Sequence, residues 1–540
     1  MIKVLKKIYH FYTKNFVLDV NSQKFINHNK TMIKIPDTFA TKKKVLFEYT
    51  ENKALITAYS YFAQVLNKNY KYEMITYKLF EESKVFNFLE KIIKPSVSKE
   101  FASFGIFKNI NPIENYSIKK KAKYLYKKKI KILNKKKDIE KIKIEGILIG
   151  DLLYDAYLKK NKKPTLYIGD ENFNNFSIKF IESFLFWKNY IFKNDIKFII
   201  CNHTVYESAL TIRIAFKKKS CKCFQVTQES VFQLTEKNKF SYKQFEVYNY
   251  KEIFKKLNIK NQRKLKKLSS ERIKLRFNGT VGVDMGYSTK SGYGSKFYKK
   301  RVLKKSLKIK ILIATHDFLD NPHAYSGNIF SDFYEWMKYL CEFSKNNKYD
   351  WYVKCHPDFR PESLSILKLL LNNYPNINFI KPTTSHHQII DEGIDIVFTM
   401  YGTIGWEYPY LGVPCINATY NNPRFRYNFN INPRNFVEYK KILNNLEKYI
   451  KTINKEQKNE ILEFYYMNYI YFQNRTNWLI DDFDDMFKKL GGYRNRKYSV
   501  TKPAFYKYWL EDFNLQKHNR IINNLDNFIK SNKYFLLPKK

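Results

Sequence analysis

The chain has 540 residues, more than a single hydrophobic core usually supports, so its length argues against a one-domain protein. Its 44% content of hydrophobic residues is sufficient for packed cores. The formal net charge of +48 indicates nucleic acid, an anionic membrane surface or phosphorylated substrates as partners. Because Lys, Asn, Ile, Phe and Tyr are enriched together, as AT-rich coding would produce, we expect part of this charge to lie on solvated faces.

The cysteines and the hydropathy pattern indicate a cytoplasmic protein. Only Cys221 and Cys223 are close among the six cysteines, and this spacing fits neither a zinc site nor a disulfide framework. We find no secretory apolar region at the start and no uncharged run of the ~18 residues that a membrane span needs. Residues 1–9 mix apolar and basic side chains at helical spacing, which suits either an anionic bilayer surface or packing on the body of the protein.

The first half of the chain alternates between strand and helix patterns. Apolar side chains at 3- and 4-residue steps predict a helix over residues 52–67, and residues 119–143 read as an exposed basic helical excursion. Further helices are predicted from residue 150 and over 207–216. The predicted strands are residues 45–49, 74–77, 144–149, 197–201 and 222–226. This alternation predicts a parallel sheet with helices on both faces.

Glycines gather between residues 261 and 307, where we place the domain boundary. The second half then repeats the strand-helix rhythm, with strands over 309–314, 351–353 and 394–398 and helices over 329–343 and 404–411. The predicted organisation is a basic N-terminal extension (1–40), an N-terminal Rossmann-like domain (41–260), a linker (261–307), a C-terminal Rossmann-like domain (308–450) and a C-terminal helical segment (451–540).

Three polar loops follow the strands of the second half, at residues 315–323, 354–357 and 399–407. Ligands of open parallel sheets bind outside the carboxyl ends of the strands. The loops therefore predict a binding cleft.

The candidate donor-binding residues lie in these loops and just after them. Gly402, Thr403 and Gly405 form a turn into a short helix, which suits a phosphate, although the glycines could simply permit a tight turn. Glu407 could hold sugar hydroxyls or simply favour a helix start. His356 could donate a hydrogen bond to a phosphate oxygen, Pro357 would fix the backbone that orients the imidazole, and Lys354 could add positive charge. Arg424 could clamp a diphosphate or be surface charge.

The first loop also holds His316, Asp317, Asp320 and His323. Their spacing fits no regular ligand pattern, so a metal site is not favoured. We favour hydrogen bonds to substrate hydroxyls, from His316 and His323 among others, or structuring of the loop by the carboxylates.

Transfer of a sugar to a hydroxyl also needs a general base. Asp151, Asp155, His203 and Glu229 stand near predicted strand ends of the first half, and we favour Asp151 with His203. Asp151 could instead be a helix cap, His203 a core group and Glu229 plain surface.

Residues 314–323, 330–336 and 351–357 resemble bacterial surface-carbohydrate and capsule-polysaccharide biosynthesis proteins. Residues 402–407 with 412–414 are similar to a later motif of that family, and residues 150–155 and 202–206 resemble its N-terminal half; the similarity covers roughly residues 45–427. The resemblance implies a GT-B glycosyltransferase, with two Rossmann-like domains facing a cleft. The N-terminal domain (41–260) would then bind the acceptor, and the C-terminal domain (308–450) would bind the donor nucleotide. The resemblance also implies phosphate contacts from His356 and Pro357 and donor contacts from Gly402, Thr403 and Glu407.

We therefore expect a cytoplasmic glycosyltransferase of cell-surface polysaccharide synthesis. Its co-substrate would be a nucleotide sugar, with no further cofactor or metal, and its acceptor a lipid-linked or other oligosaccharide. The basic surface would suit peripheral contact with the anionic inner membrane. One alternative is a sugar-nucleotide epimerase or polyol-phosphate transferase on the same fold. Another is a nucleic-acid binder, but the sequence has neither zinc-finger spacing nor an RNA-binding aromatic signature to support it.

Overall fold

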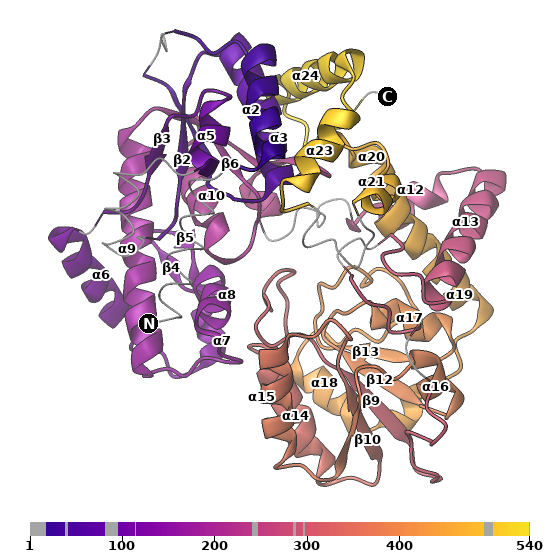
Figure 1. Ribbon diagram of the computed structural model, residues 1–540. Coiled ribbons are helices and arrows are strands. Elements are labelled where there is room, and N and C mark those ends of the chain that lie inside the picture. The colour runs from indigo at the N-terminus through magenta and orange to yellow at the C-terminus, as the bar shows by residue number, and fades with distance from the viewer. Residues whose placement is uncertain are drawn as a thin grey trace, which may run out of the picture.

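A computed structural model describes residues 18–37, 42–80, 96–113, 115–239, 247–284, 288–294, 297–490 and 500–538. The basic start of the chain, residues 1–9, lies outside the described residues. Two α/β lobes stand beside each other, and the chain crosses from the first to the second and back (Figure 1).

The first lobe is built on a six-stranded sheet in the order β3-β2-β1-β6-β7-β8. All neighbouring strands are parallel except β7 and β8. Its strands are β1 (Lys44–Glu48), β2 (Glu73–Tyr77), β3 (Lys108–Ile110), β6 (Ile196–Cys201), β7 (Lys222–Val226) and β8 (Val231–Leu234). Its helices are α2 (Val20–Met32), α3 (Lys53–Asn69), α5 (Ser96–Ala102), α6 (Tyr116–Lys129), α7 (Lys136–Ile139), α8 (Gly150–Asn161), α9 (Glu171–Lys193) and α10 (Leu210–Ala215). Successive buried side chains point to opposite faces of each strand, so one apolar core forms on each side of the sheet.

The second lobe holds a fully parallel five-stranded sheet in the order β11-β10-β9-β12-β13. Its strands are β9 (Lys310–Ala314), β10 (Asp350–Lys354), β11 (Ile377–Ile380), β12 (Ile396–Thr399) and β13 (Cys415–Asn417), and its helices are α14 (Phe333–Ser344), α15 (Pro361–Leu371), α16 (His386–Asp391), α17 (Ile404–Tyr410) and α18 (Phe436–Leu443). In both lobes the strand order reverses beside the first strand, as in Rossmann-like sheets. The predicted fold class, two Rossmann-like domains with parallel sheets facing a cleft and helices at the C-terminus, is confirmed.

The C-terminal helices connect the two lobes. Helix α19 (Lys455–Tyr465) continues through a π-helical turn (Tyr466–Tyr471) into α20 (Phe472–Thr476), followed by α21 (Phe483–Lys489), α23 (Ala504–Glu511) and α24 (Leu515–Lys530). Helices α23 and α24 pack against α2 and α3 of the first lobe, at the top of Figure 1. The chain then pairs with the edge strand β8, where Gln233 N donates to Tyr534 O at 2.8 Å and Leu536 N donates to Val231 O at 2.9 Å.

Two local predictions differ from the structure. Residues 144–149 were expected to form a buried strand, but they form a two-strand hairpin, β4 (Lys143–Ile144) and β5 (Ile147–Leu148), outside the parallel sheet. Glu145 and Gly146 occupy the left-handed backbone region at φ 51° and 77°, which reverses the chain. In the expected linker, α13 (Ile259–Phe277) forms a long helix after α12 (Tyr250–Lys255).

Candidate functional site

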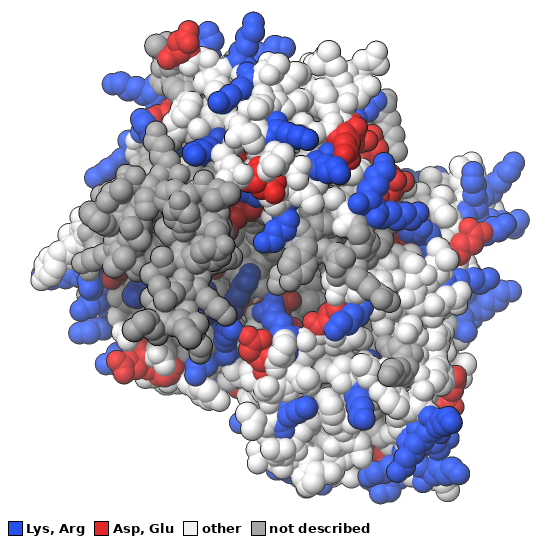
Figure 2. Space-filling view, viewed as in Figure 1, with Lys and Arg blue, Asp and Glu red and all other residues white. Residues whose placement is uncertain are grey.

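A cavity of about 590 Å³ lies between the two lobes, at the carboxyl ends of both sheets. The first lobe contributes His203, Thr204 and Val205, which follow β6. The second lobe contributes residues from all three predicted loops and from the segment after β13. In the space-filling view, Lys and Arg side chains lie along the boundary between the lobes (Figure 2).

The cavity lies where the strand order of each sheet reverses. In the second lobe His316 follows β9, and its Nε2 lies 3.2 Å from Thr399 Oγ1 at the end of β12. Tyr401 N also donates to this Nε2 at 3.3 Å, so the ring nitrogen is an acceptor and joins the two loops. Burial lowers the pKa of His316 to about 4, which keeps the ring neutral.

The first lobe has a corresponding contact between β1 and β6. Glu48 ends β1, and its Oε2 accepts a hydrogen bond of 2.8 Å from Asn202 N, next to His203. Burial raises the pKa of Glu48 to about 7. The His203 side chain is exposed on the side of the cleft and has protein around its other sides. Desolvation and, to a smaller extent, the positive charge of Lys159 lower the pKa of His203 to about 4.

Arg424 is the most unusual charged group of the cavity. Its side chain is 2% exposed, and Nη2 donates to Asn417 Oδ1 at 3.2 Å. Its Nε has no hydrogen-bond partner, and no carboxylate of the described residues is within ion-pair distance. A Cβ at Gly405 would lie 2.7 Å from this guanidinium, so glycine is needed there for close packing. Arg424 is thus a buried cation that forms no ion pair with any carboxylate in the described part of the chain.

Lys354 is the second buried cation of the cavity. Its Nζ lies 3.2 Å from His386 Nε2, and His386 Nδ1 lies 2.8 Å from Tyr408 OH. Burial lowers the pKa of Lys354 to about 8, so most of this side chain is still charged at pH 7. Within the described residues, the polar contact of this ammonium group is an imidazole and not a carboxylate.

His356 lines the cavity and has one ring nitrogen that can donate a hydrogen bond. Asp358 N donates to its Nδ1 at 3.0 Å, so the proton of the neutral ring is on Nε2. Burial lowers the pKa of His356 to about 4. Pro357 follows but does not line the cavity; its carbonyl accepts a hydrogen bond from Lys290 at 3.3 Å.

Gly402, Thr403 and Glu407 line the cavity at the turn into α17. Both carboxylate oxygens of Glu407 are already engaged. Oε1 accepts hydrogen bonds from Arg276 Nε at 2.9 Å and Nη2 at 2.6 Å, and Oε2 accepts one from Tyr293 OH at 3.1 Å. Glu407 therefore ties α13 to α17, and Arg276 is a cavity residue that the sequence did not indicate.

The loop after β9 distributes its polar side chains to separate partners. Asp317 Oδ1 accepts from Ser363 at 2.6 Å, and Oδ2 pairs with Arg360 at 3.0 Å. Asp320 instead receives a hydrogen bond of 2.5 Å from Tyr206 OH of the first lobe. Tyr206 occupies the left-handed region at φ 54°, a strained conformation for an aromatic residue.

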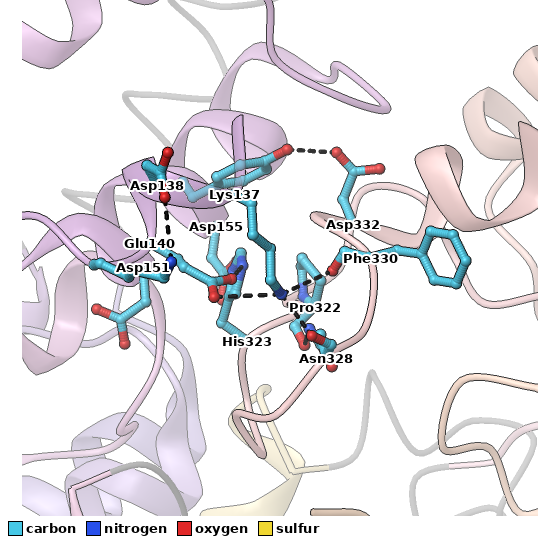
Figure 3. A network of polar contacts seen from close by, with 12 residues as sticks. Lys137, Asp138, Glu140, Asp151, Asp155, Pro322, His323, Asn328, Phe330 and Asp332 are labelled. Atoms are coloured by element: carbon cyan, nitrogen blue, oxygen red, sulfur yellow. Dashed lines mark hydrogen bonds and ion pairs between the residues drawn. The ribbon is translucent and has the colours of Figure 1, made fainter. Parts of the chain in front are cut away.

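His323, predicted to contact the donor, lies in a contact between the lobes and does not line this cavity (Figure 3). Its Nδ1 is 2.5 Å from Asp155 Oδ1, and its Nε2 is 3.0 Å from Glu140 Oε2. Burial alone would lower the pKa of His323, but the two carboxylates raise it to about 10.

Two further contacts join the lobes beside His323, and Figure 3 shows the one between Lys137 and Asn328. Lys137 Nζ donates to Asn328 O at 2.5 Å. Tyr154 OH donates to Asp332 Oδ2 at 2.6 Å. Helices α7 and α8 are thus fastened to the loop that carries Asp320.

Asp151 is also away from the cavity, in the first turn of α8. Its two oxygens accept hydrogen bonds from Arg213 Nη1 and Nη2, both at 2.6 Å. Glu229 does not line the cavity either. The structure brings eight predicted residues together around the cavity: His203, His316, Lys354, His356, Gly402, Thr403, Glu407 and Arg424.

Within the described parts of the chain, no three His, Cys, Asp or Glu side chains are grouped so that they could hold a metal ion. No helix in those parts is long and apolar enough to cross a membrane.

No family model and no curated protein matches the chain. Solved structures give weak similarities. A putative UDP-N-acetylglucosamine 2-epimerase from Listeria monocytogenes is 12% identical, with 78% of this chain and 90% of that chain covered and a TM-score of 0.22. A UDP-GlcNAc 2-epimerase from Neisseria meningitidis is 11% identical, with coverage of 79% and 98% and a TM-score of 0.21. The wall teichoic acid polymerase TagF is 12% identical, with coverage of 94% and 100% and a TM-score of 0.19. At these values the similarities support no statement about substrate or reaction.

Proposed function

We propose that the protein is a glycosyltransferase that moves a sugar from a nucleotide-activated donor to a growing cell-surface polysaccharide. The observation that carries the proposal is Arg424, a buried guanidinium at the interlobe cavity with no carboxylate partner among the described residues. A buried cation costs free energy unless an anion accompanies it. The donor phosphate supplies that anion, Lys354 adds a second positive charge, and the Nε2–H of His356 adds a neutral hydrogen-bond donor.

In the proposed reaction, the bond between the anomeric carbon of the sugar and the donor phosphate breaks. The acceptor oxygen forms the new bond to that carbon, and the electron pair of the broken bond leaves with the nucleotide phosphate. Arg424 and Lys354 stabilise the charge that develops on this phosphate. The residues that surround the phosphate thus supply electrostatic catalysis.

The acceptor hydroxyl loses its proton in the same step, and we assign the proton to Asp320. The other carboxylates of the cavity are paired or bonded to backbone N–H groups: Glu407 with Arg276, Asp317 with Arg360, and Asp358 with the backbone of residues 289 and 290. Asp320 has no ion pair among the described residues, and Tyr206 OH orients it. His203 faces the cleft from the other lobe as a neutral imidazole and hydrogen-bonds the acceptor.

The acceptor of this reaction is a lipid-linked or other oligosaccharide, presented at the cytoplasmic face of an anionic membrane. The net charge of +48 favours such a location, because basic residues are attracted to anionic lipids.

A two-step experiment tests the proposal. CMP-, UDP-, GDP- and CDP-sugars are first compared by thermal shift, because a ligand at 100 times its Kd stabilises the folded state by about 2.7 kcal/mol. The stabilising donor is then incubated with and without a membrane extract that contains lipid-linked glycans. We expect nucleotide release and sugar incorporation only with the extract. Conversion of the donor to a stereoisomer without acceptor would indicate an epimerase, and no stabilisation by any donor would also contradict the proposal.

A further inference from the structure

Helix α6 forms a basic outer surface on the first lobe. Ala122 and Tyr126 are buried, and Tyr126 OH bonds Asn174 of α9 at 2.5 Å, so this side of α6 faces the lobe. Exposed side chains occupy the opposite side of the helix. These are Tyr116, Lys120, Lys123, Tyr124, Lys127 and Lys128, which we call the α6 face. Helix α6 lies at the left edge of the molecule in Figure 1.

The charge of this helix is largely uncompensated. Seven of its 14 residues are lysine, and none is acidic. Lys121 pairs with Glu145 at 3.2 Å, but Lys120, Lys123 and Lys127 have no ion pair among the described residues. The α6 face therefore presents positive charge that no acidic side chain of the described residues neutralises, so an external anion would be attracted to it.

Apolar side chains are exposed on this helix and close to its two ends. Tyr116 is 83% exposed and Tyr124 is 58% exposed. Ile113, just before the helix, and Ile132, just after it, are 74% and 68% exposed. Lys and Tyr side chains are suited to a membrane interface, where an apolar stem or ring is buried and the polar end stays in water.

We propose that the α6 face docks the protein on a membrane surface that contains anionic lipids. Anionic lipid is favoured over nucleic acid because a phosphodiester backbone would neutralise the lysines but would leave Ile113, Tyr116, Tyr124 and Ile132 in water. The inference goes beyond the proposed sugar transfer and does not depend on it, since vesicle binding needs no donor.

The test measures sedimentation of the full-length protein with vesicles of 30% phosphatidylserine in phosphatidylcholine. Lys120→Gln, Lys123→Gln and Lys127→Gln are combined in one variant. The control combines Lys260→Gln, Lys264→Gln and Lys267→Gln, which removes three exposed lysines from α13. A contribution of about 1 kcal/mol per lysine predicts an affinity loss of about 100-fold for the α6 variant, and little for the control.

A second variant combines Tyr116→Ser with Tyr124→Ser and keeps every charge. It distinguishes binding to anionic lipid from binding to nucleic acid. It should weaken vesicle binding and leave binding to duplex DNA unchanged. The proposal would be overturned if the α6 variant and the control lost vesicle affinity equally, if the α6 variant bound vesicles like the wild type, or if the wild type did not bind vesicles. A loss confined to DNA binding would also overturn it. Thermal shifts with nucleotide sugars on the same variants report separately on the interlobe site.

Discussion

At the scale of single residues, Asp320 has the position expected of the catalytic base. It lines the cavity from the second lobe and is oriented by Tyr206 of the first lobe. Asp320→Asn keeps the shape and the hydrogen bond but removes the proton acceptor. We expect kcat to fall about 100- to 10,000-fold with little change in donor affinity, measured by steady-state kinetics and donor titration. Wild-type kcat in this variant would refute the assignment.

The sequence indicated carboxylates near strand ends but not which of them reaches the cleft. In the sequence, Asp151 and Asp320 have similar positions, because each is an acidic residue in a segment that follows a predicted apolar strand. The difference is a partner far along the chain, because Arg213 binds both oxygens of Asp151. Similarly, His316 and His323 share one loop, yet Asp155 and Glu140 of the other lobe draw His323 away from the cavity.

At the scale of elements, α17 depends on a glycine for its contact with Arg424. In Gly405→Ala the added Cβ would be 2.7 Å from the guanidinium, so Arg424 must move. We expect weaker donor binding, with no charge removed. A double-mutant cycle with Arg424→Ala checks this by calorimetry, because Gly405→Ala should have no further effect once the guanidinium is gone. Independent, additive losses would contradict the packing argument.

The contact between α7, α8 and the loop after β9 gives a stability prediction. His323→Gln leaves the buried Asp155 carboxylate without its cation, which should cost about 3 to 5 kcal/mol and lower the melting temperature at pH 7. The pKa of His323 is raised to about 10, so its contribution is complete below its ordinary pKa near 6.5 and disappears as the pH rises through 10.

The difference in melting temperature between wild type and His323→Gln should therefore be large at pH 6.5 and small above pH 10. Glu140 and Asp155, which face the ring, are present in both proteins, and burial raises the pKa of Asp155 to about 6, so the comparison is made at pH 6.5 and above. A difference that does not change with pH would contradict the charged pair.

Long periodic elements were predictable, and short or polar ones were not. The apolar runs of β1, β6 and β9 and the buried face of α3 carry clear patterns. Strands β3 and β13 have only three residues each. Helix α13 buries just Ser269, Ile273, Arg276 and Phe277, so its pattern resembles a polar linker, and Arg276 was missed with it.

At the scale of the whole molecule, the first lobe is completed by the end of the chain. Helices α23 and α24 supply part of one of its two cores, and residues 534–536 cover the edge of β8. We expect residues 1–260 alone to show no cooperative thermal unfolding, because this core would be open to water. A sharp calorimetric transition from this fragment would show that the lobe folds without its C-terminal part.

The central claim is that the interlobe cavity binds the phosphate of a nucleotide-activated donor through Arg424. Calorimetric titration of the donor into wild type, Arg424→Gln and Arg426→Gln tests it most directly. Arg426 is an exposed arginine of the same segment, so its variant is the matched control. Loss of a charged hydrogen bond of about 1.5 to 3 kcal/mol predicts roughly 10- to 100-fold weaker binding for Arg424→Gln and unchanged binding for Arg426→Gln. Wild-type affinity in a folded Arg424→Gln protein would contradict the account.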